Sequence, residues 1–401
     1  MLQVSTYRRI LLLCVLILCL PLCACGDPEN DAEDTFMQTA DMSESTITAY
    51  VPSEKGIFWD VTGIEPSDEG AVVGSVSFPA ELVQYEAAFN CSYIEYLIYY
   101  YNYNYAAYQE LLRTDGRVNW GAAFQGDQTV GEYASEQTEE TLRFYAGIET
   151  IAVKNGITLT QADLDAIEAD RQEVVTELGS EEAFEAYLRK TGLSRASYDR
   201  VAAYADLFAD LIPLTRDESS ALYLSDEKLN AYATYADYIY IASVNLDTYA
   251  AVSADEFARK KAEAEAIAAD ILSAEDPAAR FAELADEKSE DPYRSSNPNG
   301  YIYTAGTMSE VFEAAAAALA SGEVSGLVEG SSGWYIILRK DLPSHLAKDP
   351  EADAEWRESW LRDQIRDETR SYVFTLNPAL AELDIGTFYD AYAAKLDTME
   401  N

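Results

Sequence analysis

Two β-rich runs far apart in the chain constrain its fold most strongly. The first, residues 235–242, places tyrosines among aliphatic and small residues, and the second, residues 332–338, reads Ser-Gly-Trp-Tyr-Ile-Ile-Leu. Such alternation is typical of strands that bury one face. Between them lie two helical patterns, a short third strand and a third helix, at residues 253–271, 281–288, 301–303 and 309–319. This order predicts a small antiparallel sheet covered by helices.

The N-terminus has the pattern of an export signal. Arg8 and Arg9 precede an uncharged apolar run, Ile10 to Leu20, that is too short to span a membrane comfortably. Leu-Cys-Ala-Cys then ends at Cys25, as in a bacterial lipobox. The pattern predicts a signal peptide over 1–25, cleavage before Cys25 and lipid attachment to its sulfur. We therefore expect an extracytoplasmic protein anchored by this lipid to the outer face of the cell membrane.

Charge and cysteine usage exclude several classes of function. The chain carries 71 acidic and 28 basic residues, a net charge of −43, which argues against nucleic acid as a partner. Cys91 is the single cysteine after Cys25, so the mature chain has no intramolecular disulfide. Without a Cys/His cluster or a phosphate-binding glycine loop, we expect no metal and no cofactor.

Composition divides the rest of the chain. Residues 26–70 are acidic and rich in Ser, Thr, Asp and Glu, which predicts a flexible tether. Residues 71–228 read as a helical domain, 229–342 as the sheet domain, and 343–401 as a C-terminal helical segment.

The pattern predicts a long helix that runs toward Leu112, and its stretch from Tyr93 to Tyr108 is unusually rich in tyrosine. It has two interpretations. The rings either form a surface that faces a client protein, or pack on neighbouring elements with their hydroxyls at the rim, and we favour packing.

Two segments resemble known families. Residues 235–339 resemble the parvulin family of peptidyl-prolyl cis-trans isomerases, through Phe281 to Pro292, Gly306 to Glu313 and Leu319 to Val328 in the family's order. The string NGITLT…LDAI…LGSEEAFEAYLRKTGLSRASYDR, within residues 155–200, resembles the N-terminal helical domain of SurA-type and PrsA-type chaperones. Together they imply an α+β fold, with a parvulin-like domain inserted in or following an all-α chaperone-like domain. In the PrsA-like arrangement, the C-terminal segment packs on the helical domain.

The parvulin resemblance also implies roles for individual residues. Met308 and Phe312 match the proline pocket, and their spacing of four suggests that both face one side of a helix. Tyr303 matches an aromatic position on the adjoining strand. Asp291 matches the Cys/Asp position near the substrate carbonyl, and Ser332 matches a hydroxyl in the turn before the last strand.

The chain departs from the family where two histidines are expected. Tyr238 and Tyr335 occupy these positions, and the one histidine of the chain, His345, lies beyond the matched motifs. Either the two tyrosines form a substitute hydrogen-bonded pair, since a phenol both donates and accepts, or the domain only binds extended segments.

The resemblance implies a membrane-anchored foldase that isomerises X-Pro bonds in newly secreted or unfolded proteins. A chaperone with a degenerate isomerase domain, and a lipoprotein that binds a dedicated partner, are the alternatives. A homodimer through the helical domain is a further implication of the PrsA-like pattern.

Overall fold

The computed structural model describes residues 55–105, 108–248 and 250–400. Within these residues the chain forms two compact units. Unit 1 consists of residues 55–214 and 361–400, and unit 2 of Thr215–Trp360. Unit 2 thus extends beyond the predicted domain 229–342 on both sides. The signal peptide, Cys25 and the tether up to residue 54 lie outside the described residues.

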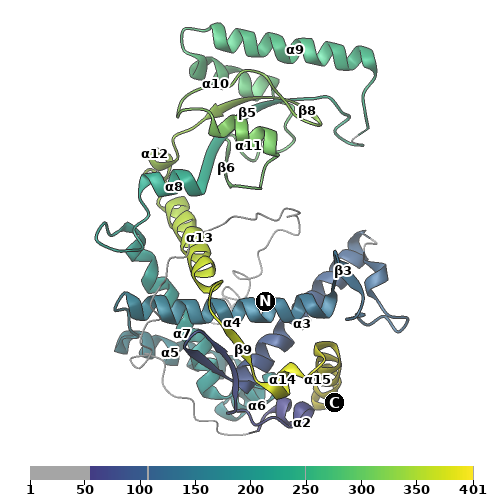
Figure 1. Cartoon of the computed structure of the whole chain (residues 1–401), viewed down its shortest axis with the longest axis vertical. Helices are drawn as coiled ribbons and strands as arrows, with labels where there is room; N and C mark the ends of the chain where they lie inside the picture. Colours follow the sequence, from purple (N-terminus) through teal and green to yellow (C-terminus); the bar gives the residue numbers. More distant parts are fainter. Residues whose placement is uncertain (1–54, 106–107, 249, 401) are drawn as a thin grey trace. The chain divides into compact units, whose positions relative to one another are not determined.

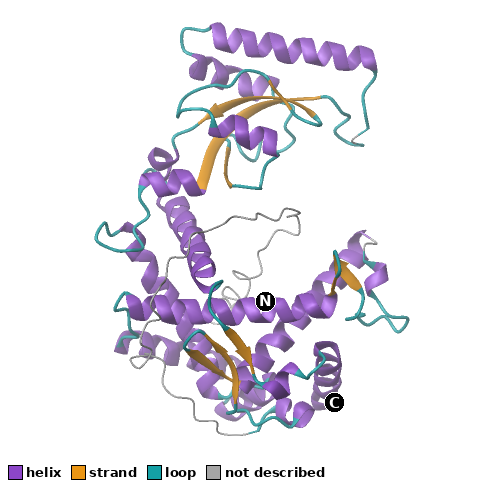
Figure 2. Cartoon of the chain, viewed as in Figure 1, coloured by secondary structure: helices purple, strands orange, loops and turns teal. Residues whose placement is uncertain are grey.

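Unit 2 is built on a four-stranded antiparallel sheet in the order β6-β5-β8-β7 (Figures 1 and 2). The strands are β5 (Ala233–Ala242), β6 (Tyr301–Thr304), β7 (Val328–Glu329) and β8 (Gly333–Arg339). Its helices are α8 (Asp226–Tyr232), α9 (Ala254–Ser273), α10 (Pro277–Lys288), α11 (Glu310–Ala317) and α12 (Leu342–Leu346). The predicted α+β class and the antiparallel sheet are confirmed.

The two faces of this sheet bury different side chains. Alternate residues of β5 and β8, including Ile239, Ile241 and Trp334, pack with α9 and α10 in one apolar cluster. The other residues of the same strands, including Ala236 and Ile337, pack with α11 in a second cluster. Because side chains alternate along a strand, the tyrosines at 238 and 240 share the α11 face.

Gly300 allows the tight turn that leads into β6. Gly300 has φ +88°, and a Cβ added there would lie 2.5 Å from the carbonyl oxygen of Ala236. Only glycine accommodates both this left-handed backbone and this close approach without strain. The turn places Tyr301 opposite Ala236 in the β5–β6 ladder.

Unit 1 is mainly helical, with two small antiparallel sheets. The helices are α2 (Ile57–Thr62), α3 (Ala80–Tyr105), α4 (Val130–Lys154), α5 (Gln161–Leu178), α6 (Glu181–Thr191), α7 (Arg195–Leu211), α14 (Pro378–Ala381) and α15 (Ile385–Glu400). One sheet has the order β2-β1-β9, from β1 (Glu69–Val73), β2 (Val76–Pro79) and β9 (Phe374–Leu376), and the other is the hairpin of β3 (Ala123–Gln125) and β4 (Gln128–Thr129). Thr160 and Ser180 cap the N-termini of α5 and α6, where their hydroxyls accept hydrogen bonds from the backbone N–H groups of Asp163 and Ala183.

The C-terminal residues complete unit 1 after α13 (Pro350–Thr369) leads out of unit 2. Strand β9 pairs with β1, and α15 packs on α2 and α3. The ring centroid of Phe58 lies 5.8 Å from that of Phe388 and 5.4 Å from that of Tyr392. The predicted tether 26–70 therefore extended too far, because Ile57 and Phe58 are buried in α2.

Candidate active site on the tyrosine face of the sheet

Three tyrosines on the two central strands, β5 and β8, form the base of the candidate site. Tyr240 on β5 lies directly opposite Tyr335 on β8, and their rings stack with centroids 5.0 Å apart. Tyr238 lies one step along the same face, and its ring meets that of Tyr335 edge-on at 5.8 Å. Both Tyr238 and Tyr335 are half-buried, so each keeps part of its ring at the surface.

Phe312 on α11 packs beneath these rings. Its centroid lies 5.3 Å from Tyr238, 5.4 Å from Tyr335 and 6.0 Å from Tyr303, and its side chain is 1% exposed. Tyr303 on β6 is also buried. Phe312 is therefore a core residue covered by tyrosines, and not an open pocket floor.

Met308 reaches the same cluster from outside the helix. It is half-buried and packs with Phe312, but α11 begins only at Glu310. The expectation that both residues lie on one helix is thus wrong, although both belong to one apolar cluster. The loop before the helix is held by Glu313, whose carboxylate accepts the N–H groups of Gly306 at 3.1 Å and Met308 at 2.8 Å.

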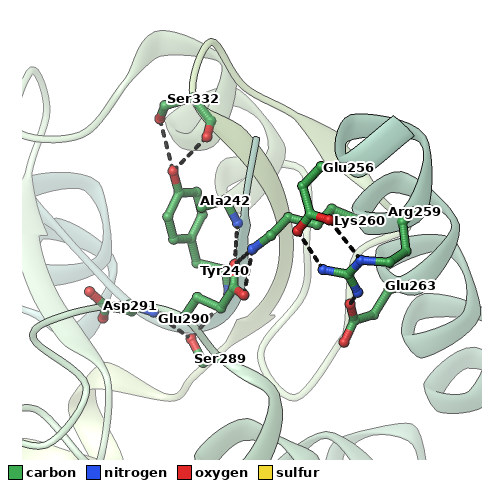
Figure 3. A network of polar contacts seen from close by, with 10 residues as sticks. All are labelled: Tyr240, Ala242, Glu256, Arg259, Lys260, Glu263, Ser289, Glu290, Asp291 and Ser332. Carbon is green, nitrogen blue, oxygen red and sulfur yellow. Dashed lines mark hydrogen bonds and ion pairs between the residues drawn. The ribbon is translucent and has the colours of Figure 1, made fainter. Parts of the chain in front are cut away.

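Asp291 is brought to the tyrosines by the segment that follows α10. Figure 3 shows this segment beside the end of β5, where the N–H of Glu290 donates to the carbonyl of Tyr240 at 2.7 Å. The N–H of Tyr240 in turn donates to the Ser289 hydroxyl at 3.1 Å. Asp291 is 8% exposed, and the Tyr301 hydroxyl donates to its Oδ2 at 2.5 Å.

An ion pair between Glu290 and Lys260, which we call the Glu290 latch, holds this segment in place (Figure 3). The Glu290 carboxylate accepts the N–H of Ala242 at 2.8 Å, and both of its oxygens lie 2.6 Å from Lys260 Nζ on α9. Sequence reasoning missed Glu290, Lys260 and Tyr301. The strand register and the turn at Gly300 place Tyr301, but one sequence contains no signal that Lys260 faces Glu290.

The phenol hydroxyls of Tyr238, Tyr301 and Tyr335 are protonated at neutral pH. Burial, followed by the negative charge of Asp291 and hydrogen bonding with Tyr301 and Asp291, raises the pKa of Tyr238 well above its usual value. Burial and the hydrogen bond to Asp291 raise the pKa of Tyr301 to about 12. Burial also raises the pKa of Tyr335. These phenols can donate hydrogen bonds, but they do not act as bases near neutrality.

Tyr238 and Tyr335, for which a hydrogen-bonded pair was one of two alternatives, meet through their ring edges and lie beside different polar groups. Tyr238 interacts with Asp291 and Tyr301, as described above. The Tyr240 hydroxyl donates to the carbonyl of Ser332 at 2.7 Å and lies 3.1 Å from its hydroxyl.

His345 takes no part in the site. Its ring packs on Tyr235 with centroids 4.6 Å apart. Tyr235 is an odd-numbered residue of β5, so it points to the face opposite Tyr238.

The part of the chain that the structure describes contains no group of three or more His, Cys, Asp or Glu side chains that could hold a metal ion. Among its described helices, none combines the length and apolar character needed to cross a membrane.

Comparison with protein families decides what kind of domain carries this site. Residues 249–341 match the rotamase family described as the PPIC-type PPIase domain. Unit 2 contains a PPIC-type PPIase domain. The match covers Asp291, Tyr303, Met308 and Phe312, together with Ser332 and Tyr335, but begins after β5, so Tyr238 lies outside it.

Several solved structures match about two thirds of the chain at low identity. PrsA from Bacillus cereus is 15% identical, with 70% of this chain and 96% of that chain covered and a TM-score of 0.30. PrsA from Bacillus subtilis is 18% identical, with 69% and 90% covered and a TM-score of 0.23. A SurA-like chaperone structure from Campylobacter jejuni is 19% identical, with 63% and 94% covered and a TM-score of 0.21. No curated protein matches the chain.

Proposed function

We propose that the protein is an extracytoplasmic foldase whose PPIase domain isomerises X-Pro bonds in newly secreted proteins. The observation that carries this proposal is the placement of Met308, Tyr238 and Tyr335. All three side chains are partly exposed and belong to one cluster. Within it, Tyr238 lies beside Asp291 and Tyr301, and the Tyr301 hydroxyl donates to Asp291. A proline ring resting on the thioether and the two phenol rings would hold its peptide bond next to these polar groups.

Isomerisation requires the site only to stabilise a twisted peptide bond. Rotation about the peptide bond is opposed by amide resonance, with a barrier of about 18–20 kcal/mol. In the twisted state the amide nitrogen loses conjugation and becomes a hydrogen-bond acceptor. A neutral phenol can donate to this nitrogen or to the carbonyl oxygen, and each 1.36 kcal/mol of preferential stabilisation raises the rate about tenfold. Tyr238 is the donor we assign to this role, because burial and the nearby negative charge of Asp291 raise its pKa and keep its hydroxyl protonated.

A second candidate is proline-segment binding without catalysis. Phe312 is covered by Tyr238 and Tyr335, and the Asp291 carboxylate already accepts the Tyr301 hydroxyl. A site that keeps its polar groups occupied can bind an extended segment without stabilising the twisted amide better than the planar one, and such uniform binding gives no acceleration.

Exchange spectroscopy by NMR separates the two candidates. The full chain is added at substoichiometric amounts to a peptide with one X-Pro bond, and both the cis–trans exchange rate and the chemical-shift changes are recorded. Isomerase function predicts a faster exchange rate that falls with Met308→Ala. Shift changes with no rate increase above the peptide alone would establish binding only, and the absence of both would refute both functions.

Anchoring is the second part of the proposal. Cys25 would carry lipid after signal cleavage and hold the protein at the outer face of the membrane, where unfolded secreted proteins are its partners. Its support is the sequence pattern around Cys25. Fractionation of cells that express Cys25→Ser tests it: the variant should leave the membrane fraction, and retention there in the same amount as wild type would refute lipid anchoring.

A lipoprotein that binds one dedicated partner remains the alternative from another class. Suppression of aggregation of several unrelated unfolded proteins by the full chain favours the foldase, and protection of none favours the dedicated binder.

A further inference from the structure

The second half of α3 exposes an unusual number of aromatic rings. Five tyrosines, which we call the tyrosine ladder, have exposed fractions between 39% and 89%: Tyr96, Tyr99, Tyr100, Tyr103 and Tyr105. The interpretation that favoured packing is wrong for these five. Cys91, Ile94 and Ile98 form the buried face of this part of α3, so the five exposed tyrosines lie off this face.

Tyr96, Tyr99, Tyr100 and Tyr103 are spaced three or four residues apart, so they share one face of the helix, and half-buried Tyr101 links Tyr100 to Tyr105. Ring centroids are 6.1 Å apart for Tyr96 and Tyr100, 5.4 Å for Tyr100 and Tyr101, and 5.8 Å for Tyr101 and Tyr105. At about 200 Å² for a fully exposed ring, the ladder offers about 600 Å² of surface. This value is at the upper end of the largest patch on an ordinary monomer, where such patches often bind partners.

A second copy of the chain is a poor occupant for this surface. A standard interface buries about 800 Å² on each partner, which is more than the ladder provides. Each copy also carries a net charge of −43, so two copies repel one another as they approach.

Charge favours a basic occupant instead. Residues 96–105 contain no charged side chain, while the chain as a whole has a net charge of −43. Tyrosine faces attract ammonium and guanidinium groups. The protein itself shows this contact, since Lys340 Nζ lies 4.7 Å from the ring centroid of Tyr235. The field of the whole protein concentrates cations near its surface, and the ladder offers them ring faces.

We propose that the tyrosine ladder is a docking site for extended polypeptide segments that carry lysine or arginine. Their charged groups lie over ring faces, and their free backbone groups pair with phenol hydroxyls. The inference rests on the proposed foldase function for its biological meaning, since it names the class of client segment. It concerns unit 1 and requires no catalysis by unit 2.

Fluorescence anisotropy with the full chain tests this proposal. The probe is a labelled, proline-free 15-residue peptide of alternating lysine and small apolar residues, and a second peptide has glutamate in place of lysine. Without proline, the result is independent of isomerase activity. The triple variant Tyr96→Ser, Tyr103→Ser, Tyr105→Ser should bind the lysine peptide at least tenfold more weakly, and the matching triple Tyr→Phe variant should keep most of the affinity.

The control is Leu164→Ser with Leu178→Ser, which removes two exposed apolar side chains of α5 in the same unit and should leave the Kd unchanged. Circular dichroism confirms that each variant is folded. An unchanged Kd in the triple Ser variant would overturn the proposal, because the peptide would then bind the acidic surface at large. Equal binding of the glutamate peptide would also overturn it. Self-association in sedimentation experiments that the triple Ser variant abolishes would identify a second copy as the occupant, and would overturn it too.

Discussion

The Glu290 latch gives the most quantitative prediction. Glu290→Ala removes the acceptor for the N–H of Ala242 and the ion-pair partner of Lys260. Hydrogen bonds to charged groups contribute about 1.5–3 kcal/mol each. The Glu290 side chain is 35% exposed and that of Lys260 is 14% exposed, so solvent screens part of this energy. We expect the variant to destabilise the attachment of residues 289–291 by about 2–3 kcal/mol.

Glu290→Gln separates the two contributions. The amide oxygen still accepts the N–H of Ala242, so only the ionic part is lost, about 1 kcal/mol. Glu263→Ala is the matched control: it removes an exposed ion pair with Arg259 on the same helix, α9, and Figure 3 shows this pair apart from the latch. A surface pair of this kind contributes little, so the control should behave as wild type.

Hydrogen exchange measured by mass spectrometry reports the local stability of individual peptides. It therefore detects loss of the latch in unit 2 separately from any change in unit 1. Amides in peptides covering 240–243 and 289–294 should exchange about 30 to 150 times faster in Glu290→Ala, since 1.4 kcal/mol corresponds to a factor of ten. Glu290→Gln should give about a fivefold increase, and Glu263→Ala none. The same rates in Glu290→Ala and in the control would refute the reasoning that this carboxylate holds the Asp291 segment.

Two further predictions concern stability. Burial raises the pKa of Glu86 from 4.5 to about 8, although a hydrogen bond from Tyr145 opposes the shift. The native state thus binds a proton that the unfolded state releases, and the resulting stability is fully present below about pH 4.5 and is lost as the pH rises to about 8. At 1.36 kcal/mol per pKa unit the change is on the order of 4–5 kcal/mol. Glu86→Gln should remove that part of the pH dependence of the urea midpoint, and a wild-type slope in the variant would contradict the assignment. Gly300→Ala should lower the melting temperature of unit 2 more than Gly306→Ala does. Both residues have positive φ, but only at position 300 would the new Cβ strike a backbone carbonyl, and equal losses would contradict this explanation.

The strands and the tyrosine positions were predictable because they depend on local pattern. The period of two in residues 235–242 places Tyr238 on one face, and the helix order places Phe312 against it. The partner of Tyr238 was not predictable in the same way. It depends on where residues 289–300 cross the end of β5, and this path is fixed by the Glu290 latch and by the close approach at Gly300.

Contacts between distant residues explain the other misses. A six-residue helix such as α2 has too few turns to show a period, and Phe58 is buried only because Phe388 and Tyr392 return from the C-terminus. The exposure of the tyrosine ladder was predicted wrongly for the opposite reason, because here the local pattern itself indicated burial. Aromatic residues usually signal a buried face, but in α3 Ile94 and Ile98 already occupy the buried positions and leave the rings outside.

The proposed catalysis depends most directly on the Tyr238 hydroxyl as a neutral hydrogen-bond donor. The decisive measurement is the NMR exchange rate of an X-Pro peptide with wild type, Tyr238→Phe and Tyr240→Phe. Tyr240 is the matched control, because it lies on the same strand and face but its hydroxyl already donates to Ser332. The account predicts catalysis by wild type, a loss of at least tenfold in Tyr238→Phe, and a change within about twofold in Tyr240→Phe, since tenfold corresponds to one hydrogen bond of about 1.4 kcal/mol. Equal rates in the two variants, or no catalysis by wild type, would contradict it.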